Sequence, residues 1–115
     1  MIRFQSAKPK QFLTGSTAAH KAAQEGDVEG LEEVLDLLEG LVNQKDSNGW
    51  TPLHEGARAG HVEVVKVLVD NGAKLNEKSN LGETPLYWAE KQHGTLHPVS
   101  KLLKDLGAIS LGPDL

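Results

Sequence analysis

The sequence has no cysteine, few aromatic residues and no long apolar run. The absence of cysteine excludes a disulfide scaffold, a thiolate zinc site and a cysteine nucleophile, and it is compatible with any redox compartment. Aromatic residues make up only 4% of the 115 residues, so a core must be built from Leu, Val and Ala. A membrane span needs about 18 consecutive apolar residues, which the sequence lacks, and membrane insertion is therefore not expected.

Positive charge is also scarce. The sequence has 12 Lys and Arg against 16 Asp and Glu, a formal charge of −4, and its pI is about 5.7. A nucleic-acid-binding domain typically has a pI above about 9, and the lysines are too sparse for a phosphate track, so no nucleic-acid partner is expected.

Residues 22–44 hold seven acids and no Lys or Arg. We interpret them as a solvated helix face, with long-range attraction of a basic partner as the alternative.

The first 16 residues lack the continuous apolar run of a secretory signal. They carry basic residues without an acid, which is a weak transit-peptide feature. The compartment stays unknown from the sequence; we expect a soluble intracellular protein, with the cytoplasm favoured and an organelle left open. Three apolar side chains of this segment are expected to fold back over the structure that follows: Phe4, Phe12 and Leu13.

A repeat of about 33 residues runs through the chain. The pentapeptide Gly-Trp-Thr-Pro-Leu at residues 49–53 recurs as Gly-Glu-Thr-Pro-Leu at residues 82–86, 33 positions later. A weaker copy at residues 17–26 precedes its counterpart at residues 51–60 by 34 positions. The sequence therefore predicts three copies of one structural unit.

Each copy carries the signals of a short helix. Thr51 is a suitable N-cap, because its hydroxyl can accept a backbone N–H that the first turn leaves free. Pro52 follows at the first helical position, where a missing N–H costs nothing. Gly60 ends the helix, since glycine enters the left-handed conformation without strain. A helix of about eight residues is too short to persist alone in water, so each copy must stack on a neighbour.

A second helix, ending at Gly72, is expected in the middle copy. Its residues 61–69 are rich in Val and partly alternate, a pattern that on its own favours a strand. The equivalent residues 31–38 are rich in Leu with helical spacing, and equivalent positions of a repeat share one structure, so we predict a helix. Asn-Gly at residues 48–49 and Leu-Gly at residues 81–82 predict tight turns.

Thr-Pro-Leu-His at residues 51–54, within this period, resembles the ankyrin repeat, whose signature is Thr-Pro-Leu-His-x-Ala. The resemblance implies an all-α ankyrin-repeat solenoid of about three helix-turn-helix units, joined by short β-hairpin or turn fingers. The middle copy departs from the pattern at Gly56, where Ala is usual, and the outer two copies are degenerate. The expected divisions are an N-terminal extension at 1–15, units at about 16–45, 46–78 and 79–108, and a C-terminal tail at 109–115.

By this resemblance, ankyrin stacks bind other proteins on a concave surface of finger tips and first helices. Carried over position by position, the expected partner-binding residues are Lys45, Ser47, Asn48, Trp50, Arg58, Lys78, Asn80, Leu81, Glu83, Lys91 and Gln92.

Trp50 is the residue that we expect to contribute most to binding, because large aromatic residues are enriched among binding hot spots. The alternative is that Trp50 only packs on a neighbouring finger. Arg58 is the second choice, with a solvated surface charge as its alternative. Trp88 stands at a position that normally carries a buried Leu, and we interpret it as a filler of the core or of the C-terminal end.

Five histidines invite a metal interpretation. His93 and His97 have the spacing of two ligands on one helix face, but the glycine between them and the proline that follows indicate a loop. No metal or cofactor is therefore expected. By the family resemblance, His20 and His54 form hydrogen bonds near the starts of their helices. No catalytic motif occurs, and an enzyme is not expected.

The expected function is that of a scaffold or adaptor, a module that binds another protein through the concave surface of fingers and inner helices. A rigid stack loses little conformational entropy when it binds. The chain would act as a monomer or as a subunit of a hetero-complex. Two alternatives remain open: a structural accessory subunit of a larger multi-protein assembly, or the recruiting arm of a larger enzyme.

Overall fold

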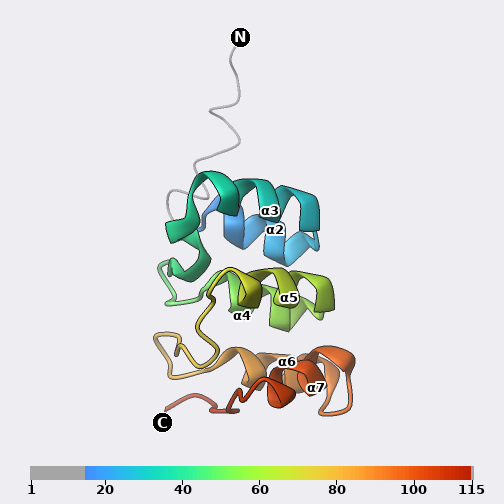
Figure 1. Cartoon of the computed structure of the whole chain (residues 1–115). Coiled ribbons are helices and arrows are strands. Elements are labelled where there is room, and N and C mark those ends of the chain that lie inside the picture. Colours follow the sequence, from blue (N-terminus) through green and yellow to red (C-terminus); the bar gives the residue numbers. More distant parts are fainter. Residues whose placement is uncertain (1–14, 115) are drawn as a thin grey trace.

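A computed structural model describes residues 15–114 of the chain as three stacked layers of helices (Figure 1). A 3₁₀ helix, η2 (Glu39–Asn43), follows the first layer, and no strand occurs within the described range. The all-helical fold of stacked helix pairs is therefore confirmed, and the segments between the pairs are turns. The layers consist of α2 (Ala18–Glu25) with α3 (Val28–Leu37), α4 (Pro52–Ala59) with α5 (Val62–Asp70), and α6 (Pro85–His93) with α7 (Pro98–Asp105).

Three threonines, Thr17, Thr51 and Thr84, occupy the same place in the three layers, as the N-caps of α2, α4 and α6. Each hydroxyl accepts the backbone N–H of the residue three positions later, at 3.3, 3.4 and 3.5 Å. Pro52 and Pro85 follow at the first helical position, where no N–H is needed. The repeat read from the sequence is thus a repeat of structure.

The Val-rich segment of the middle layer is a helix, α5, as the register of the repeat predicts. Val64, Val65 and Leu68 are buried on one side of it. Burial of three apolar side chains is worth more than the few tenths of a kcal/mol that each β-branched residue costs a helix. Packing in the stack therefore overrides the local preference of this segment for a strand.

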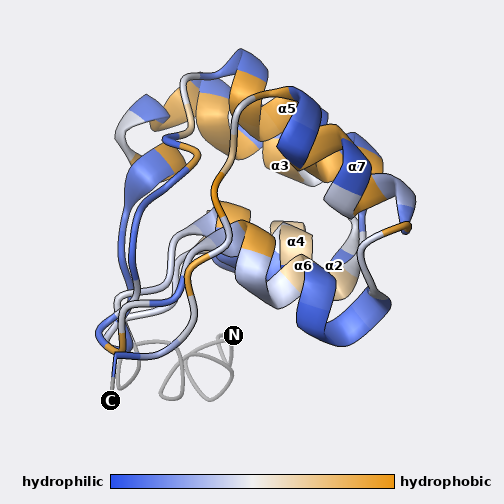
Figure 2. Cartoon of the chain, turned by 90° about the horizontal axis from the view of Figure 1, so that it is seen from below, coloured by the Kyte–Doolittle hydropathy of each residue, from blue (hydrophilic) through white to orange (hydrophobic). Residues whose placement is uncertain are grey.

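The core lies between the inner helices α2, α4 and α6 and the outer helices α3, α5 and α7 (Figure 2). Its largest apolar side chains are the fully buried Leu31, Leu53, Leu68 and Leu103. Gly56 in α4 serves this packing, because a Cβ at its position would lie 2.7 Å from Cγ1 of Val64. The departure from the usual Ala lets the Val of α5 approach the backbone of α4.

The C-terminal residues cover the last layer without forming a helix or strand. The N–H of Thr84 donates to the carbonyl of Leu111 at 3.1 Å, and the N–H of Leu111 donates to the Thr84 hydroxyl at 3.0 Å. The N–H of Asp114 donates to the carbonyl of Leu81 at 2.6 Å. Phe4, Phe12 and Leu13 lie outside the described residues.

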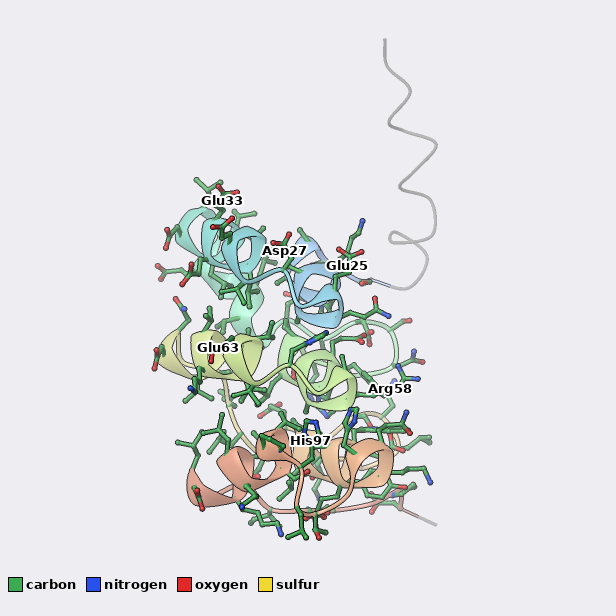
Figure 3. The ribbon with its side chains drawn as sticks, turned by 90° about the vertical axis from the view of Figure 1, so that its right-hand side faces the viewer. Glu25, Asp27, Glu33, Arg58, Glu63 and His97 are labelled. Atoms are coloured by element: carbon green, nitrogen blue, oxygen red, sulfur yellow. The ribbon has the colours of Figure 1, made fainter. Side chains whose placement is uncertain are left out.

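The acidic residues of the first layer are exposed, in accord with a solvated helix face. Figure 3 shows Glu25, Asp27 and Glu33 around this layer, away from the second. Asp27 also caps α3, since its carboxylate accepts the N–H of Gly30 at 3.0 Å.

Candidate partner-binding surface

Two fingers project from the stack, and each is closed by turn hydrogen bonds. In finger 46–50, the N–H of Asp46 donates to the carbonyl of Trp50 at 2.9 Å, and the N–H of Gly49 donates to the carbonyl of Asp46 at 2.9 Å. Finger 79–83 repeats both bonds 33 residues later, at 2.8 and 2.9 Å. One side chain orders each tip: the Asp46 carboxylate accepts the N–H groups of Asn48 and Trp50, and the Ser79 hydroxyl plays the equivalent role.

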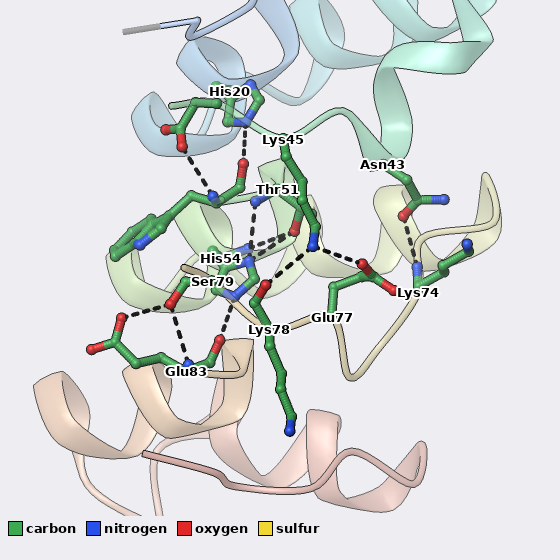
Figure 4. Close-up of polar contacts among 12 residues, drawn as sticks. His20, Asn43, Lys45, Thr51, His54, Lys74, Glu77, Lys78, Ser79 and Glu83 are labelled. Carbon is green, nitrogen blue, oxygen red and sulfur yellow. Dashed lines mark hydrogen bonds and ion pairs between the residues drawn. The ribbon is translucent and has the colours of Figure 1, made fainter. Parts of the chain in front are cut away.

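The two fingers are bonded to each other. The backbone N–H of Asn80 donates to the carbonyl of Asn48 at 2.9 Å, and the Asn80 amide donates to the carbonyl of Ser47 at 2.8 Å. Gly49 has φ of 77°, and a Cβ there would lie 2.6 Å from the backbone nitrogen of Asn80, so only glycine permits this approach. Lys45 spans the same gap, with its Nζ 3.2 Å from the Lys78 carbonyl and 3.2 Å from Glu77 (Figure 4).

His20 and His54 fasten each inner helix to the finger of the next unit. The backbone N–H of Thr51 donates to Nδ1 of His54 at 3.1 Å, so this nitrogen is an unprotonated acceptor. Nε2 then carries the proton and donates to the carbonyl of Glu83 at 2.9 Å. His20 repeats the arrangement, with Nε2 2.7 Å from the carbonyl of Trp50 (Figure 4).

This geometry needs a neutral imidazole. Both rings are buried, and desolvation lowers the pKa of His20 and the pKa of His54 below the ordinary value of 6.5. The hydrogen bond to a backbone carbonyl acts in the opposite direction, and its effect is the smaller one. The two histidines therefore have a structural role, as the resemblance implies.

Trp50, Trp88 and Arg58 form a cluster between the second and third layers, at the inner helices α4 and α6. The two indole rings lie 5.1 Å apart with their planes inclined by 48°, and both are partly exposed. The Arg58 guanidinium lies 5.7 Å from the Trp50 ring and 5.9 Å from the Trp88 ring. Trp50 thus packs on the next unit and still presents a surface to solvent, and its contribution to partner binding stays a prediction.

Two positions in this region differ from a simple transfer of the repeat pattern. Trp88 does not fill the core, because it is partly exposed: its ring lies beside Trp50, and its indole N–H donates to Oε1 of Glu83 at 3.2 Å, while its role at the C-terminal end stays a prediction. Glu83, a predicted tip residue, is only 5% exposed and also accepts the Ser79 hydroxyl at 3.0 Å, and its part in partner binding stays a prediction.

The other predicted site residues are exposed, and they lie on or just before the two fingers and at the ends of the inner helices. Figure 3 shows Arg58 at the end of α4. The exposed positions are Lys45, Ser47, Asn48, Arg58, Lys78, Asn80, Leu81, Lys91 and Gln92.

Sequence reasoning missed Glu55, an inner-helix residue near Asp46 and Arg58. Desolvation and the Asp46 charge raise the pKa of Glu55 from 4.5 to about 6, against the opposing effect of Arg58.

His93 and His97 flank the loop that was predicted between them. Their rings lie 4.6 Å apart, but Nε2 of His93 bonds to the carbonyl of Arg58 at 2.7 Å and Nδ1 of His97 accepts the N–H of Val99 at 3.1 Å. Within residues 15–114, no group of three or more His, Cys, Asp or Glu side chains is placed to hold a metal ion. In the same range, no helix is long and apolar enough to cross a membrane.

Stacked helix pairs with interlocked turns define a helical-repeat solenoid, and comparison with known proteins specifies which one. A family model described as ankyrin repeats (3 copies) matches residues 2–79 and, in a second match, residues 33–110. The chain therefore belongs to the ankyrin repeat family. Ankyrin repeats generally mediate protein–protein interaction and are typically non-enzymatic.

Several curated proteins are similar to the chain over part of their length. The chain is 42% identical over 72 residues to a transient receptor potential cation channel subfamily A member 1 homolog from Caenorhabditis elegans, and the match covers 63% of the chain and 6% of that protein. It is 39% identical over 90 residues to ankyrin repeat domain-containing protein SOWAHB from Homo sapiens, with a match that covers 70% of the chain and 11% of that protein. It is 33% identical over 97 residues to NAD-capped RNA hydrolase NUDT12 from Macaca fascicularis, with a match that covers 81% of the chain and 21% of that protein.

Proposed function

We propose that the chain is a scaffold or adaptor module that binds another protein on its concave surface of fingers and inner helices. The observation that supports the proposal is the cluster of Trp50, Trp88 and Arg58 between the second and third layers, where all three side chains are at least partly exposed. Aromatic and arginine side chains are the types most enriched at binding hot spots. Here they lie partly exposed on a face whose backbone is already ordered by finger-to-finger hydrogen bonds.

Pre-ordering is the physical basis of this function. The tips of both fingers are held by Asp46 and Ser79, and the fingers are held to each other by Asn80. A partner that binds them therefore need not order flexible loops, which otherwise costs about 0.5–1.5 kcal/mol for each immobilised side chain. The chain itself supplies no catalytic group in this proposal.

Affinity capture with the purified chain tests the proposal. We expect a partner that the wild type retains and that the double variant Trp50→Ala with Arg58→Ala loses. The matched control replaces Glu63 and Lys66, which pair with each other on the exposed side of outer helix α5. Equal capture by both double variants would contradict binding at the concave surface.

A structural accessory subunit is a second candidate, favoured by exposed apolar side chains on the two end layers. Leu37 and Leu38 are 81% and 60% exposed on the first layer, and Leu96 is 82% exposed on the last. An obligate subunit should be poorly folded or self-associating when isolated, whereas an independent module should be monomeric with a cooperative melt. Size-exclusion chromatography and thermal unfolding of the isolated chain distinguish these two candidates.

A recruiting arm of a larger protein is a third candidate. The chain spans 6%, 11% and 21% of the three relatives described above, one of which is an RNA hydrolase. Extending the reading frame in both directions tests this candidate: an added catalytic domain would support it.

A further inference from the structure

A hollow of about 400 Å³ opens between finger 46–50 and finger 79–83. Trp50 and Trp88 contribute to its walls, and Asn48, Leu81 and Glu83 are among its other lining residues. Glu83 is the only titratable side chain in this lining. The hollow therefore combines two indoles with one carboxylate.

Within the described residues, the hydrogen bonds of the Glu83 carboxylate involve only one of its two oxygen atoms. Its Oε1 atom accepts both the Ser79 hydroxyl at 3.0 Å and the Trp88 indole N–H at 3.2 Å. No hydrogen bond within the described part of the chain involves Oε2, which carries no dashed line in Figure 4. No fully buried side-chain N or O atom there lacks a partner, so Oε2 is not sealed from solvent, and Glu83 is one of the residues that line the hollow.

Within the described residues, no ion pair joins Arg58 to this carboxylate. Its guanidinium lies over the two indoles, but Arg58 is not one of the residues that line the hollow. Lys45 is also engaged elsewhere, with Lys78 and Glu77. The lining therefore presents a recessed negative charge without a cation of its own.

On the basis of the proposed function, we propose that this hollow receives a lysine or arginine side chain of the partner protein, with its charge beside Oε2 of Glu83 and its aliphatic stem against Trp50 and Trp88. Indole rings attract cations, and the stems of long basic side chains pack well on apolar surfaces. An acidic side chain would be repelled by the recessed carboxylate. An apolar one would leave Oε2 desolvated without a hydrogen bond, which is costly.

Peptide titrations of the full chain, followed by ¹⁵N–¹H NMR, test the inference. The chain has two tryptophans, so two indole N–H signals report on the hollow directly. The probes are end-blocked Gly-Gly-X-Gly-Gly peptides with X as Lys, Arg, norleucine or Glu. We expect saturable shifts of the Trp88 indole signal with the Lys or the Arg peptide, and binding at least about tenfold weaker for the norleucine and Glu peptides.

Glu83→Gln separates charge from shape, because the amide oxygen can still accept the bonds from Ser79 and Trp88. We expect it to weaken binding of the basic peptide by about tenfold or more. Glu77→Gln is the matched control, since it removes a carboxylate that precedes finger 79–83 and lies outside the lining, and it should leave that binding unchanged. If Glu83→Gln is not folded by circular dichroism, Trp50→Leu, which removes one indole face, serves instead with the same expected loss.

The inference is overturned if neither basic peptide binds, if norleucine binds equally well, or if Glu83→Gln has no effect in the folded protein. Its failure is distinguishable from failure of the proposed function. Partner capture that depends on Trp50 and Arg58, without any binding of the basic peptides, would overturn this inference alone. Peptide binding without any effect of those variants on capture would instead contradict the proposed function.

Discussion

Trp50 is the residue that we predict to contribute most to partner binding. Its ring contacts His54 at 5.6 Å and Trp88 at 5.1 Å, yet part of it stays exposed. We predict that Trp50→Ala weakens partner capture by more than about 1 kcal/mol while the melting temperature changes little. Titration calorimetry with the captured partner, beside a thermal melt, measures both quantities. A large loss of stability with unaltered binding would assign Trp50 to the packing of the stack.

His54 contributes to stability through the hydrogen bonds of its ring. Nδ1 accepts the backbone N–H of Thr51, which requires a neutral ring and completes the capping box, and Nε2 donates to the carbonyl of Glu83 in the next unit. We predict that His54→Ala lowers the free energy of unfolding by about 2–3 kcal/mol, from the lost cap and the buried carbonyl left unpaired. The control is His61→Ala, because His61 is only partly buried and makes one bond, to the Gln24 carbonyl. A loss no larger than that of the control, measured by urea unfolding, would contradict this role.

The buried histidines also predict how stability depends on pH. Their pKa values are lowered in the folded chain, so below about pH 6.5 the unfolded chain binds more protons than the folded one. The free energy of unfolding should be highest above this pH and should fall as the pH drops, by at most about 1.4 kcal/mol per pH unit for each histidine.

Glu55 acts in the opposite direction over a lower range. Because its pKa is raised from 4.5 to about 6, the folded chain binds more protons between these values, and stability from Glu55 rises as the pH falls. Glu55→Gln should therefore make the acid loss of stability steeper below pH 6. Urea unfolding at several pH values checks both trends, and a stability that does not change between pH 7.5 and 5.5 in this variant would contradict the neutral histidines.

Among the elements, the glycine that ends α4 shows how one layer fits the next. Gly60 has φ of 80°, and a Cβ there would lie 2.8 Å from Nε2 of His93, which bonds to the Arg58 carbonyl. Gly72 has φ of 92° with nothing within 4 Å of its Cβ position. Gly72 is therefore a control for Gly60, because a substitution there causes backbone strain without a contact between layers.

We predict that Gly72→Ala costs about 1 kcal/mol from backbone strain and that Gly60→Ala costs about 1 kcal/mol more, from the displaced His93 bond. In a His93→Ala background, the two substitutions should cost the same. Denaturant unfolding of these variants measures the difference. An extra cost of Gly60→Ala that persists without His93 would exclude this contact as its cause.

The inner helices were predictable because each begins after a Thr cap and ends at a Gly, and two of the three also have a Pro at the first helical position. Repetition also resolved the Val-rich segment of α5, whose local pattern alone favours a strand.

The candidate site was predictable from the sequence only in part. The period places residues on a finger, but it does not say which way a side chain turns, and so Glu83 turned inward and Trp88 outward. The burial and electrostatics of Glu55 depend on Asp46 and Arg58, which only the folded chain brings near it.

The whole molecule is held together by contacts between neighbouring layers. α2 packs on α4 and α4 packs on α6, while hydrogen bonds from His20 and His54 cross the same two boundaries. No inner helix exceeds nine residues, so none is stable by itself. Loss of packing in one layer should therefore destabilise the others.

Equilibrium unfolding with two probes tests this dependence most directly. Trp50 and Trp88 fluorescence reports on the boundary of the second and third layers, and circular dichroism reports on all helices. Leu31→Ala removes a fully buried side chain from the first layer, at a cost of about 2–5 kcal/mol. If the layers depend on one another, the two transitions coincide and Leu31→Ala shifts both equally. A fluorescence transition that stays in place while the circular dichroism transition splits would show that the layers fold independently.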